Sequence, residues 1–329
     1  MSLRALPAAV AALAVAGLVL GPVAAVLWRA GDWGRLGPGD WQALRFTLWQ
    51  ALLSATVSTV LAVPLARALA RRRFAGRGLL VALLGAPFIL PTLVAVLGLV
   101  AVFGQNGVLN GALRAAGLPT LSIYGLHGVV LAHVFFNLPL ATRLLLQGWH
   151  AIPAERFRLA ASLGLSPWAL FGTLEAPMLT RIAPGAFAVI FVICLSSFAV
   201  ALTLGGGPRA TTVELAIYQA VRFDFDLGRA ALLSVVQLGL ALAAGLVALR
   251  LGAGAGFGAG LDRVLPRWDA RGGWSRALDA LWILLAALFL LLPLALVAAR
   301  GLPGLLLLDA GIWQAAGHSL SVALASTML

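Results

Sequence analysis

Residues 152–177 read IPAERFRLAASLGLSPWALFGTLEAP and separate two apolar runs, each long enough to cross a bilayer. Pro153 suits the first position of a helix, because its missing N–H would have no partner there. Glu155 in the first turn favours the positive end of the helix dipole. Gly164 follows about three turns later and fits a left-handed helix cap. The stretch therefore starts with a short helix that ends at a glycine turn.

A second helix is predicted after this turn. Ser166 supplies an N-cap hydroxyl, Pro167 takes the first helical position, and Pro177 is expected to end the helix. We call residues 153–177 the hairpin. It carries a small apolar surface flanked by two cations, and the residues concerned are Phe157, Ala160, Ala161 and Leu165, with Arg156 and Arg158 beside them. That surface is too short to cross a membrane.

The composition indicates an integral membrane protein. Hydrophobic residues make up 62% of the chain and charged residues 10%, whereas roughly a quarter of residues are charged in soluble domains. All 23 positive residues are arginine, since the sequence contains no lysine. A phosphate-loop ATPase and a Schiff-base enzyme both need a lysine. Any ATP hydrolysis must therefore come from a partner.

The net charge of +12 is explained by membrane orientation. A nucleic-acid-binding face gathers its charge on a soluble domain, whereas these arginines lie between apolar runs, so nucleic acid is not an expected partner. Arg67, Arg71, Arg72, Arg73 and Arg77 lie in one short loop, which favours the cytoplasmic side and places the N-terminus there too. Attraction to anionic lipid headgroups adds to this effect. The four histidines show no metal-ligand spacing.

Apolar runs predict an all-α, polytopic transmembrane helical bundle. About seven complete spans are expected, at residues 5–28, 42–69, 79–103, 125–146, 182–204, 230–249 and 278–297, and an eighth span begins at residue 313. Pro87 and Pro91 predict a kinked or broken third span, through either routine packing or a gating hinge. The Gly-rich segment 250–276 is expected to be a cytoplasmic loop because it carries Arg263, Arg267, Arg271 and Arg276.

Polar residues at two places are candidates for contact with a solute or an external partner. His133 and Asn137 lie one turn apart on one face of a predicted span, where they must find partners inside the bundle. The sequence leaves two roles open for this pair, namely interhelical hydrogen bonding and the lining of a solute path. The predicted external segment 210–230 carries Glu214, Tyr218, Asp224 and Asp226. These residues either contact a soluble partner or cationic solute, or belong to an interfacial helix with a charged face.

The hairpin resembles the cytoplasmic loop of ABC-transporter permeases. The family pattern is Glu-Ala-Ala, three residues, Gly, nine residues, Ile, one residue, Leu-Pro. Ala160, Gly164 and Pro177 match it at the right spacing, while Arg158, Leu159, Leu174 and Ala176 depart from it. The resemblance implies a coupling helix that docks in a cleft of an ATPase subunit. The residues that it implies for docking are Glu155, Arg156, Arg158, Ala160, Ala161, Gly164, Leu165 and Pro177.

Within that family, the chain is similar to permeases that import thiamine and thiamine pyrophosphate. The shared runs are AHVFFNLPLATRLLLQ from Ala132, RLAASLG from Arg158 and LTLGGGPRATTVELAIYQA from Leu202. The resemblance implies a multi-pass protein of the bacterial inner membrane, fed by a periplasmic binding protein and driven by a homodimeric ATPase that binds ATP and Mg²⁺. The chain itself is expected to bind no cofactor and to catalyse no reaction. Ferric iron and polyamines are alternative solutes, and a membrane-embedded lipid-modifying enzyme is the rival from another class.

A repeat predicts the domain organisation. Residues 313–329 align with residues 41–57 at an offset of 272, with seven identities in seventeen positions. The copies begin the second and the eighth predicted spans, six places apart, so both point the same way. A solute path belongs at the interface of such parallel repeats. Residues 1–272 are therefore predicted to form a first permease domain of six spans, and residues 273–329 the start of a second, truncated one. A second hairpin is expected near residues 425–450 of a longer chain.

Overall fold

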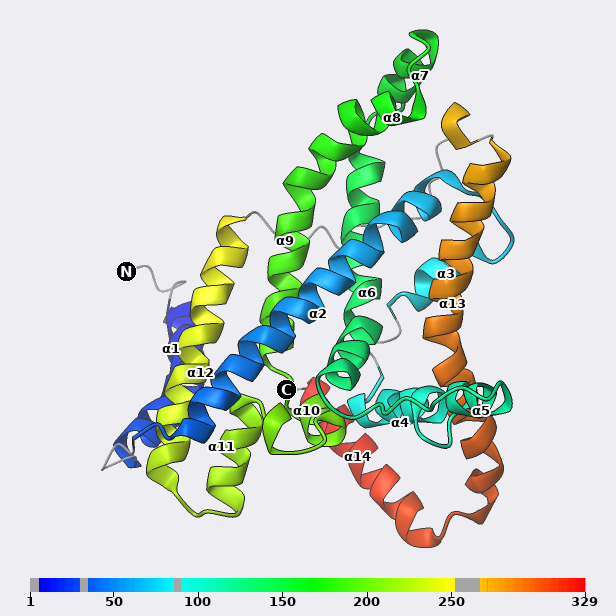
Figure 1. The fold of residues 1–329 in the computed structure, drawn as a ribbon. Coiled ribbons are helices and arrows are strands. Elements are labelled where there is room, and N and C mark those ends of the chain that lie inside the picture. The colour runs from blue at the N-terminus through cyan, green and yellow to red at the C-terminus, as the bar shows by residue number, and fades with distance from the viewer. Residues whose placement is uncertain (1–5, 30–34, 86–89, 252–266, 271, 329) are drawn as a thin grey trace.

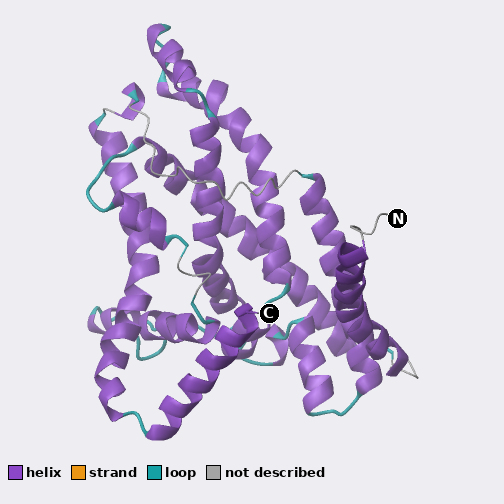
Figure 2. Ribbon diagram, turned by 180° about the vertical axis from the view of Figure 1, so that it is seen from behind, coloured by secondary structure: helices purple, strands orange, loops and turns teal. Residues whose placement is uncertain are grey.

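The computed structural model describes residues 6–29, 35–85, 90–251, 267–270 and 272–328. Within these ranges the chain is helical and forms no strand (Figures 1 and 2). Seven helical stretches in the described part are long and apolar enough to cross a membrane. The predicted all-α transmembrane bundle is therefore confirmed. Pro87, Arg263 and Arg271, which the sequence singled out, lie outside the described residues.

Helices of very different lengths make up the bundle. The long ones are α1 (Leu6–Arg29), α2 (Pro38–Arg71), α6 (Leu126–Ala151), α9 (Ala176–Leu195), α12 (Leu227–Arg250), α13 (Gly273–Gly301) and α14 (Ala310–Met328). The short ones are α3 (Arg77–Leu83), α4 (Thr92–Phe103), α5 (Val108–Ala115), α7 (Ala154–Ser162), α8 (Pro167–Leu170), α10 (Phe198–Leu204) and α11 (Val213–Arg222). A π-helical turn, η3, covers Phe171–Glu175, and 3₁₀ turns cover Pro208–Ala210 (η4), Trp268–Ala270 (η5) and Leu302–Leu307 (η6).

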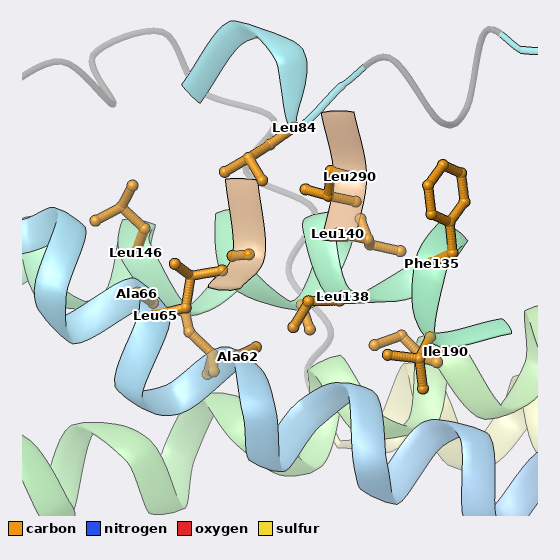
Figure 3. Packing of buried hydrophobic residues seen from close by; sticks show 14 of the residues in the cluster. Ala62, Leu65, Ala66, Leu84, Phe135, Leu138, Leu140, Leu146, Ile190 and Leu290 are labelled. Atoms are coloured by element: carbon orange, nitrogen blue, oxygen red, sulfur yellow. The ribbon is translucent and has the colours of Figure 1, made fainter. Parts of the chain in front are cut away.

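The core lies where α2, α6 and α9 pack together, with α13 on its edge (Figure 3). Helix α2 contributes small residues such as Ala62 and Ala66, while α6 contributes large ones such as Phe135 and Leu138. Lipid tails are as apolar as leucine, so helices in a bilayer associate through close packing rather than through exclusion of water. Alanines on α2 allow the helix backbones to approach closely.

The two ends of the bundle differ in what they carry. One end holds the tip of the hairpin, formed by α7 and α8, together with the C-terminal end of α2 and the start of α13 (Figure 1). The opposite end holds α11 and the starts of α2 and α14 (Figure 1). The arginine-bearing end of α2 and start of α13 therefore lie at the same end as the hairpin.

The predicted third span is broken, as expected. Helices α3 and α4 are separate, and Pro91 is the N-cap of α4. Helix α4 and the following α5 run nearly crosswise to α6 and α13 in both views (Figures 1 and 2). Because proline lacks an N–H and disfavours helix at the preceding residue, a new helix direction begins there.

The structure overturns the prediction that Pro177 ends a helix. The chain is helical from Pro167 to Leu195, and Pro177 lies in the first turn of α9. The amide of Ala176 donates to the carbonyl of Phe171, five residues back, so the helix widens into the turn η3 just before the proline. Proline cannot donate to the carbonyl four residues before it. Because of the wider turn η3, the helix continues through Pro177 without a break although the proline donates no backbone hydrogen bond.

The predicted span 182–204 is also wrong in its extent, because α9 ends at Leu195 and α10 begins at Phe198. The last carbonyls of α9 are satisfied by side-chain amides from other helices. Gln50 donates to Cys194 at 2.7 Å and Gln237 donates to Leu195 at 3.0 Å. Interhelical bonds of this kind make a helix end tolerable inside a membrane.

Helix α13 packs against α2 and α4, which precede the predicted repeat boundary at residue 272. A Cβ atom at Gly98 of α4 would lie 2.8 Å from the backbone oxygen of Pro293 in α13, so the two helices touch closely. Helices α1 and α13 end at Arg29 and Gly301, and α2 and α14 begin at Pro38 and Ala310, each pair at the offset of 272. The division into two repeats stays a prediction. The helix boundaries recur at the same offset as the sequence repeat.

Candidate functional site

The first helix of the hairpin and its glycine turn form as the local sequence predicts. Pro153 is the N-cap of α7, one position before the predicted one, and Gly164 follows the helix with a φ of +63°. The amide of Leu165 donates to the carbonyl of Ala160 at 3.1 Å, which closes the turn. Ser166 then caps α8 by accepting from the amide of Ala169 at 3.2 Å. Because a left-handed backbone favours glycine, Gly164 determines where the hairpin turns back.

The apolar surface of the hairpin differs from the predicted one. Phe157 and Ala160 are buried against the bundle, Leu165 is half-buried, and Ala161 is exposed. The large apolar side chains that face outward are instead Leu159, Leu163 and Trp168, with exposed fractions of 60%, 67% and 83%. Residues three and four apart share a helix face, so the face with Leu159 and Leu163 points away when Phe157 and Ala160 point inward. We call these three residues the outer apolar surface.

Charges border the outer apolar surface. Glu155 and Arg158 approach to 3.7 Å, and both side chains are about three-quarters exposed, at 74% and 77%. An exposed ion pair of this type adds little stability. Arg156 is exposed beside them. The three charges thus remain accessible to a partner at the tip of the hairpin.

A buried charge cluster lies where the hairpin returns to the bundle. It consists of Arg67, Arg71, Arg72, Glu175, Arg267, Asp269 and Asp279. Glu175 is fully buried. Its two carboxylate oxygens lie 2.7 Å from Arg67 Nε and 2.7 Å from Arg267 Nη1, and Trp149 Nε1 donates to it at 3.0 Å. A buried carboxylate is stable only with such partners.

Asp269 and Asp279 extend the buried charge cluster to other segments. Asp269 pairs with Arg267 at 2.8 Å and with Arg71 at 3.1 Å. Burial alone would raise the pKa of Asp269, but the hydrogen bond and charge of Arg267, with the charges of Arg71 and Arg67, hold that pKa below its ordinary value. Arg71 also donates twice to Asp279, at 2.9 and 2.8 Å. The cluster therefore joins α2, η3, η5 and α13.

Sequence reasoning missed this cluster. It assigned the arginines at the end of α2 to membrane orientation and gave no role to Glu175, Asp269 or Asp279. One signal was present, since Glu175 and Asp279 each adjoin a long apolar run. An acid in such a place needs a cation as partner, and the neighbouring loops supply only arginine.

His133 and Asn137 lie buried between α2, α6 and α9. His133 Nδ1 and Ser54 Oγ are 3.1 Å apart, and Asn137 Nδ2 donates to the carbonyl of His133 at 2.9 Å and to Cys194 Sγ at 3.4 Å. The contacts with Ser54 of α2 and Cys194 of α9 are the interhelical alternative that the sequence left open, whereas the bond to His133 lies within α6. A role in lining a solute path stays a prediction.

The acidic residues of the segment 210–230 have partners within the chain. Glu214 is half-buried and accepts from the amide of Phe198 at 2.9 Å, at the start of α10. Burial raises the pKa of Glu214, although the bond from Phe198 opposes this shift. Asp224 pairs with Arg229 at 2.8 Å, and Asp226 caps α12 by accepting from the amide of Arg229 at 2.8 Å.

Tyr218 contacts two rings edge-on. The ring centroids of Phe198 and Phe223 lie 5.2 and 5.9 Å from that of Tyr218. Tyr218 belongs to α11, a short helix that carries Glu214 and precedes Asp224 and Asp226. The structure thus brings the four predicted residues to one region at the end opposite the hairpin. Their contact with a solute or an external partner stays a prediction.

A multi-pass helical bundle with a capped helical hairpin projecting between two spans is the architecture of a polytopic membrane protein. The chain is 45% identical over 302 residues to the thiamine transport system permease protein ThiP of Salmonella typhimurium, covering 88% of this chain and 54% of the relative. It is 44% identical over 340 residues to ThiP of Escherichia coli, covering 98% and 62%. The molybdenum transport system permease protein ModB of Azotobacter vinelandii is 30% identical over 188 residues, covering 56% and 83%. The chain belongs to the family of ABC-transporter permeases.

Solved structures agree with this fold. A bacterial alginate ABC transporter in complex with an alginate pentasaccharide-bound periplasmic protein aligns with a TM-score of 0.59 at 16% identity, covering 75% of this chain and 93% of the other. A second structure of an alginate importer gives 0.56 at 17% identity, covering 74% and 95%. No protein-family model matches the chain. The chain spans between 54% and 62% of the length of the two ThiP relatives.

Proposed function

We propose that the chain supplies part of the solute path of an ATP-driven importer for thiamine or thiamine pyrophosphate in the bacterial inner membrane. The identity of 44–45% to thiamine permeases, which extends over 88% or more of the chain, carries the choice of solute. The chain acts as a transport subunit, with neither an ATPase site nor a cofactor of its own. His133 and Asn137 are the candidates for the solute path.

The hairpin is the docking element for the ATPase in this proposal. Its outer apolar surface, Leu159, Leu163 and Trp168, is exposed at the tip and bordered by Arg156, Glu155 and Arg158. Protein interfaces typically have such an apolar centre with a polar rim, and tryptophan is a frequent anchor. The partner is a homodimeric ABC ATPase that binds ATP and Mg²⁺. The hairpin end of the bundle, and with it the N-terminal end of α1, then faces the cytoplasm.

The opposite end receives the periplasmic binding protein. The region around Glu214, Tyr218, Asp224 and Asp226 lies there and adjoins three exposed aromatic or apolar residues, Phe223, Phe225 and Leu227, with exposed fractions of 65%, 78% and 49%. A related fold, the alginate transporter, occurs in complex with a periplasmic protein. This orientation also agrees with the arginines between membrane runs, which favour the cytoplasmic side.

Co-purification of the full-length protein with its ATPase, followed by uptake of labelled thiamine into proteoliposomes, tests the proposal. Trp168→Asp should weaken ATPase docking by roughly 30-fold or more, because an anchor residue contributes about 2 kcal/mol or more. Leu118→Asp, at a site 53% exposed in the loop after α5, should leave docking unchanged. Wild-type docking by Trp168→Asp would refute this surface, and external labelling of residue 164 in intact cells would refute the orientation.

Gly164→Pro tests the turn itself. Proline is held near φ of −65°, whereas Gly164 adopts +63°, so the hairpin cannot keep its turn. Membrane insertion should stay intact, since the spans are unchanged, while ATP hydrolysis is uncoupled from uptake. Normal uptake by this variant in vesicles would count against the role of the hairpin.

A further inference from the structure

Arg267 contacts both arms of the hairpin. Its guanidinium carbon lies 4.5 Å from the ring centre of Phe157, in the outgoing helix α7. Its Nη1 atom lies 2.7 Å from the carboxylate of Glu175, in the returning turn η3. The side chains of Arg267 and Glu175 are 2% and 0% exposed. Arg267 follows α12 in the chain. A segment outside the hairpin therefore contacts both arms of the hairpin at its base.

The same group of charges continues from the hairpin into two long helices. Arg67 of α2 contacts Glu175 at 2.7 Å and Asp269 at 3.6 Å. Arg71, one helical turn further along, contacts Asp269 at 3.1 Å and Asp279 of α13 at 2.8 Å. Successive ion pairs therefore connect Glu175 to α2, η5 and α13 without passing through solvent-exposed groups.

Stability alone does not explain this arrangement. Replacing a buried ion pair by apolar side chains of similar volume is often neutral or stabilising, whereas a buried pair fixes one geometry. Glu175 also lies in a π-helical turn, and such turns are rare and concentrate at functional sites. Beside the cluster, a cavity of about 660 Å³ is lined by residues of both the hairpin and the cluster, among them Phe157, Arg158, Ala161, Arg71 and Asp269. This cavity lies between the hairpin and the C-terminal end of α2.

We propose that Glu175 is a positioning residue for transport, and that Arg67 and Arg267 are the groups through which it moves α2 and α13 when the hairpin is displaced. The segment Arg267–Ala270, predicted only as part of a loop, then belongs to the coupling machinery. This inference rests on the proposed function, because it needs a hairpin that an ATPase displaces. Beyond the proposed function, the buried charge cluster is the route by which displacement of the hairpin reaches the membrane spans.

Glu175→Gln tests the route in the full-length protein with its ATPase, reconstituted in proteoliposomes. Glutamine keeps the volume and the acceptor for Trp149, but Arg67 and Arg267 lose one of their two counter-charges and keep only Asp269. The measured quantity is the number of ATP molecules hydrolysed per thiamine imported. This number should rise at least tenfold, while co-purification of the ATPase stays unchanged because the outer apolar surface is intact.

Asp40→Asn is the matched control. Asp40 is a buried carboxylate at the other end of α2, paired with Arg229 at 2.8 Å. Its loss should lower the thermal stability as Glu175→Gln does, yet leave the ATP-to-thiamine ratio at the wild-type value. An equal rise in the ratio for both variants would show that loss of stability alone uncouples transport, and would overturn the inference.

The double variant Glu175→Gln with Arg267→Gln separates folding from coupling. Neutralising both partners returns the cluster to the excess of one positive charge that it has in the wild type, so the double variant should regain thermal stability relative to Glu175→Gln alone. It should still be uncoupled. Recovery of the wild-type ratio together with stability would overturn the inference, as would a wild-type ratio in Glu175→Gln itself. Failure of the proposed function looks different, because the wild-type protein would then show no ATP-dependent uptake.

Discussion

Arg71→Lys distinguishes two explanations of the arginines at the end of α2. Arg71 is 9% exposed, and it donates to Asp279 at 2.9 and 2.8 Å and to Asp269 at 3.1 Å. Lysine keeps the positive charge that orients the membrane spans, but its single ammonium cannot reproduce the planar fork of arginine. Losing two of the three bonds, each worth about 1.5–3 kcal/mol, should lower the free energy of unfolding by about 3–6 kcal/mol.

Unfolding of the purified protein by SDS in mixed micelles, followed by tryptophan fluorescence, measures this change. Arg73→Lys is the control, because Arg73 lies two residues further on and is exposed. Its effect should stay within about 0.5 kcal/mol. A loss of less than about 1 kcal/mol for Arg71→Lys would refute the reasoning, since orientation alone would then account for the residue. An equal loss for Arg73→Lys would refute it as well.

Three further predictions concern packing and pH. Gly98→Ala should lower the free energy of unfolding by about 1–3 kcal/mol, because the new Cβ would meet the rigid backbone oxygen of Pro293 at 2.8 Å. Gly148→Ala should cost less than about 1 kcal/mol in the same SDS titration, since its nearest contacts are the movable side-chain ends of Met178 and Ile182; an equal cost at both glycines would contradict this. The lowered pKa of Asp269 means that its contribution to stability is present above the unfolded pKa and is lost as the pH falls through the folded pKa. Thermal unfolding of Asp269→Asn should therefore lose less stability on acidification than the wild type, and an identical slope would contradict the assignment.

Local chemistry was enough to predict the turn of the hairpin, but not the continuation of its second helix past Pro177. Gly164, Ser166 and Pro167 act on the backbone within a few residues, so their caps form as the sequence indicates. The site was predicted less well, because burial of Phe157 and exposure of Trp168 depend on how the hairpin meets the rest of the chain. The helix period was visible in the sequence, but nothing in it said which face would point outward.

The sequence by itself determined that this is a multi-pass helical membrane protein, because a bilayer of fixed thickness demands apolar runs of a certain length and helices that satisfy their own backbone. It also determined that arginine-rich segments share one end. Only the tertiary structure decided which of those arginines are buried in ion pairs. Arg71 and Asp279 are 208 residues apart, and no local rule connects them. Their pairing follows from the packing of α13 against α2, which is a property of the assembled bundle.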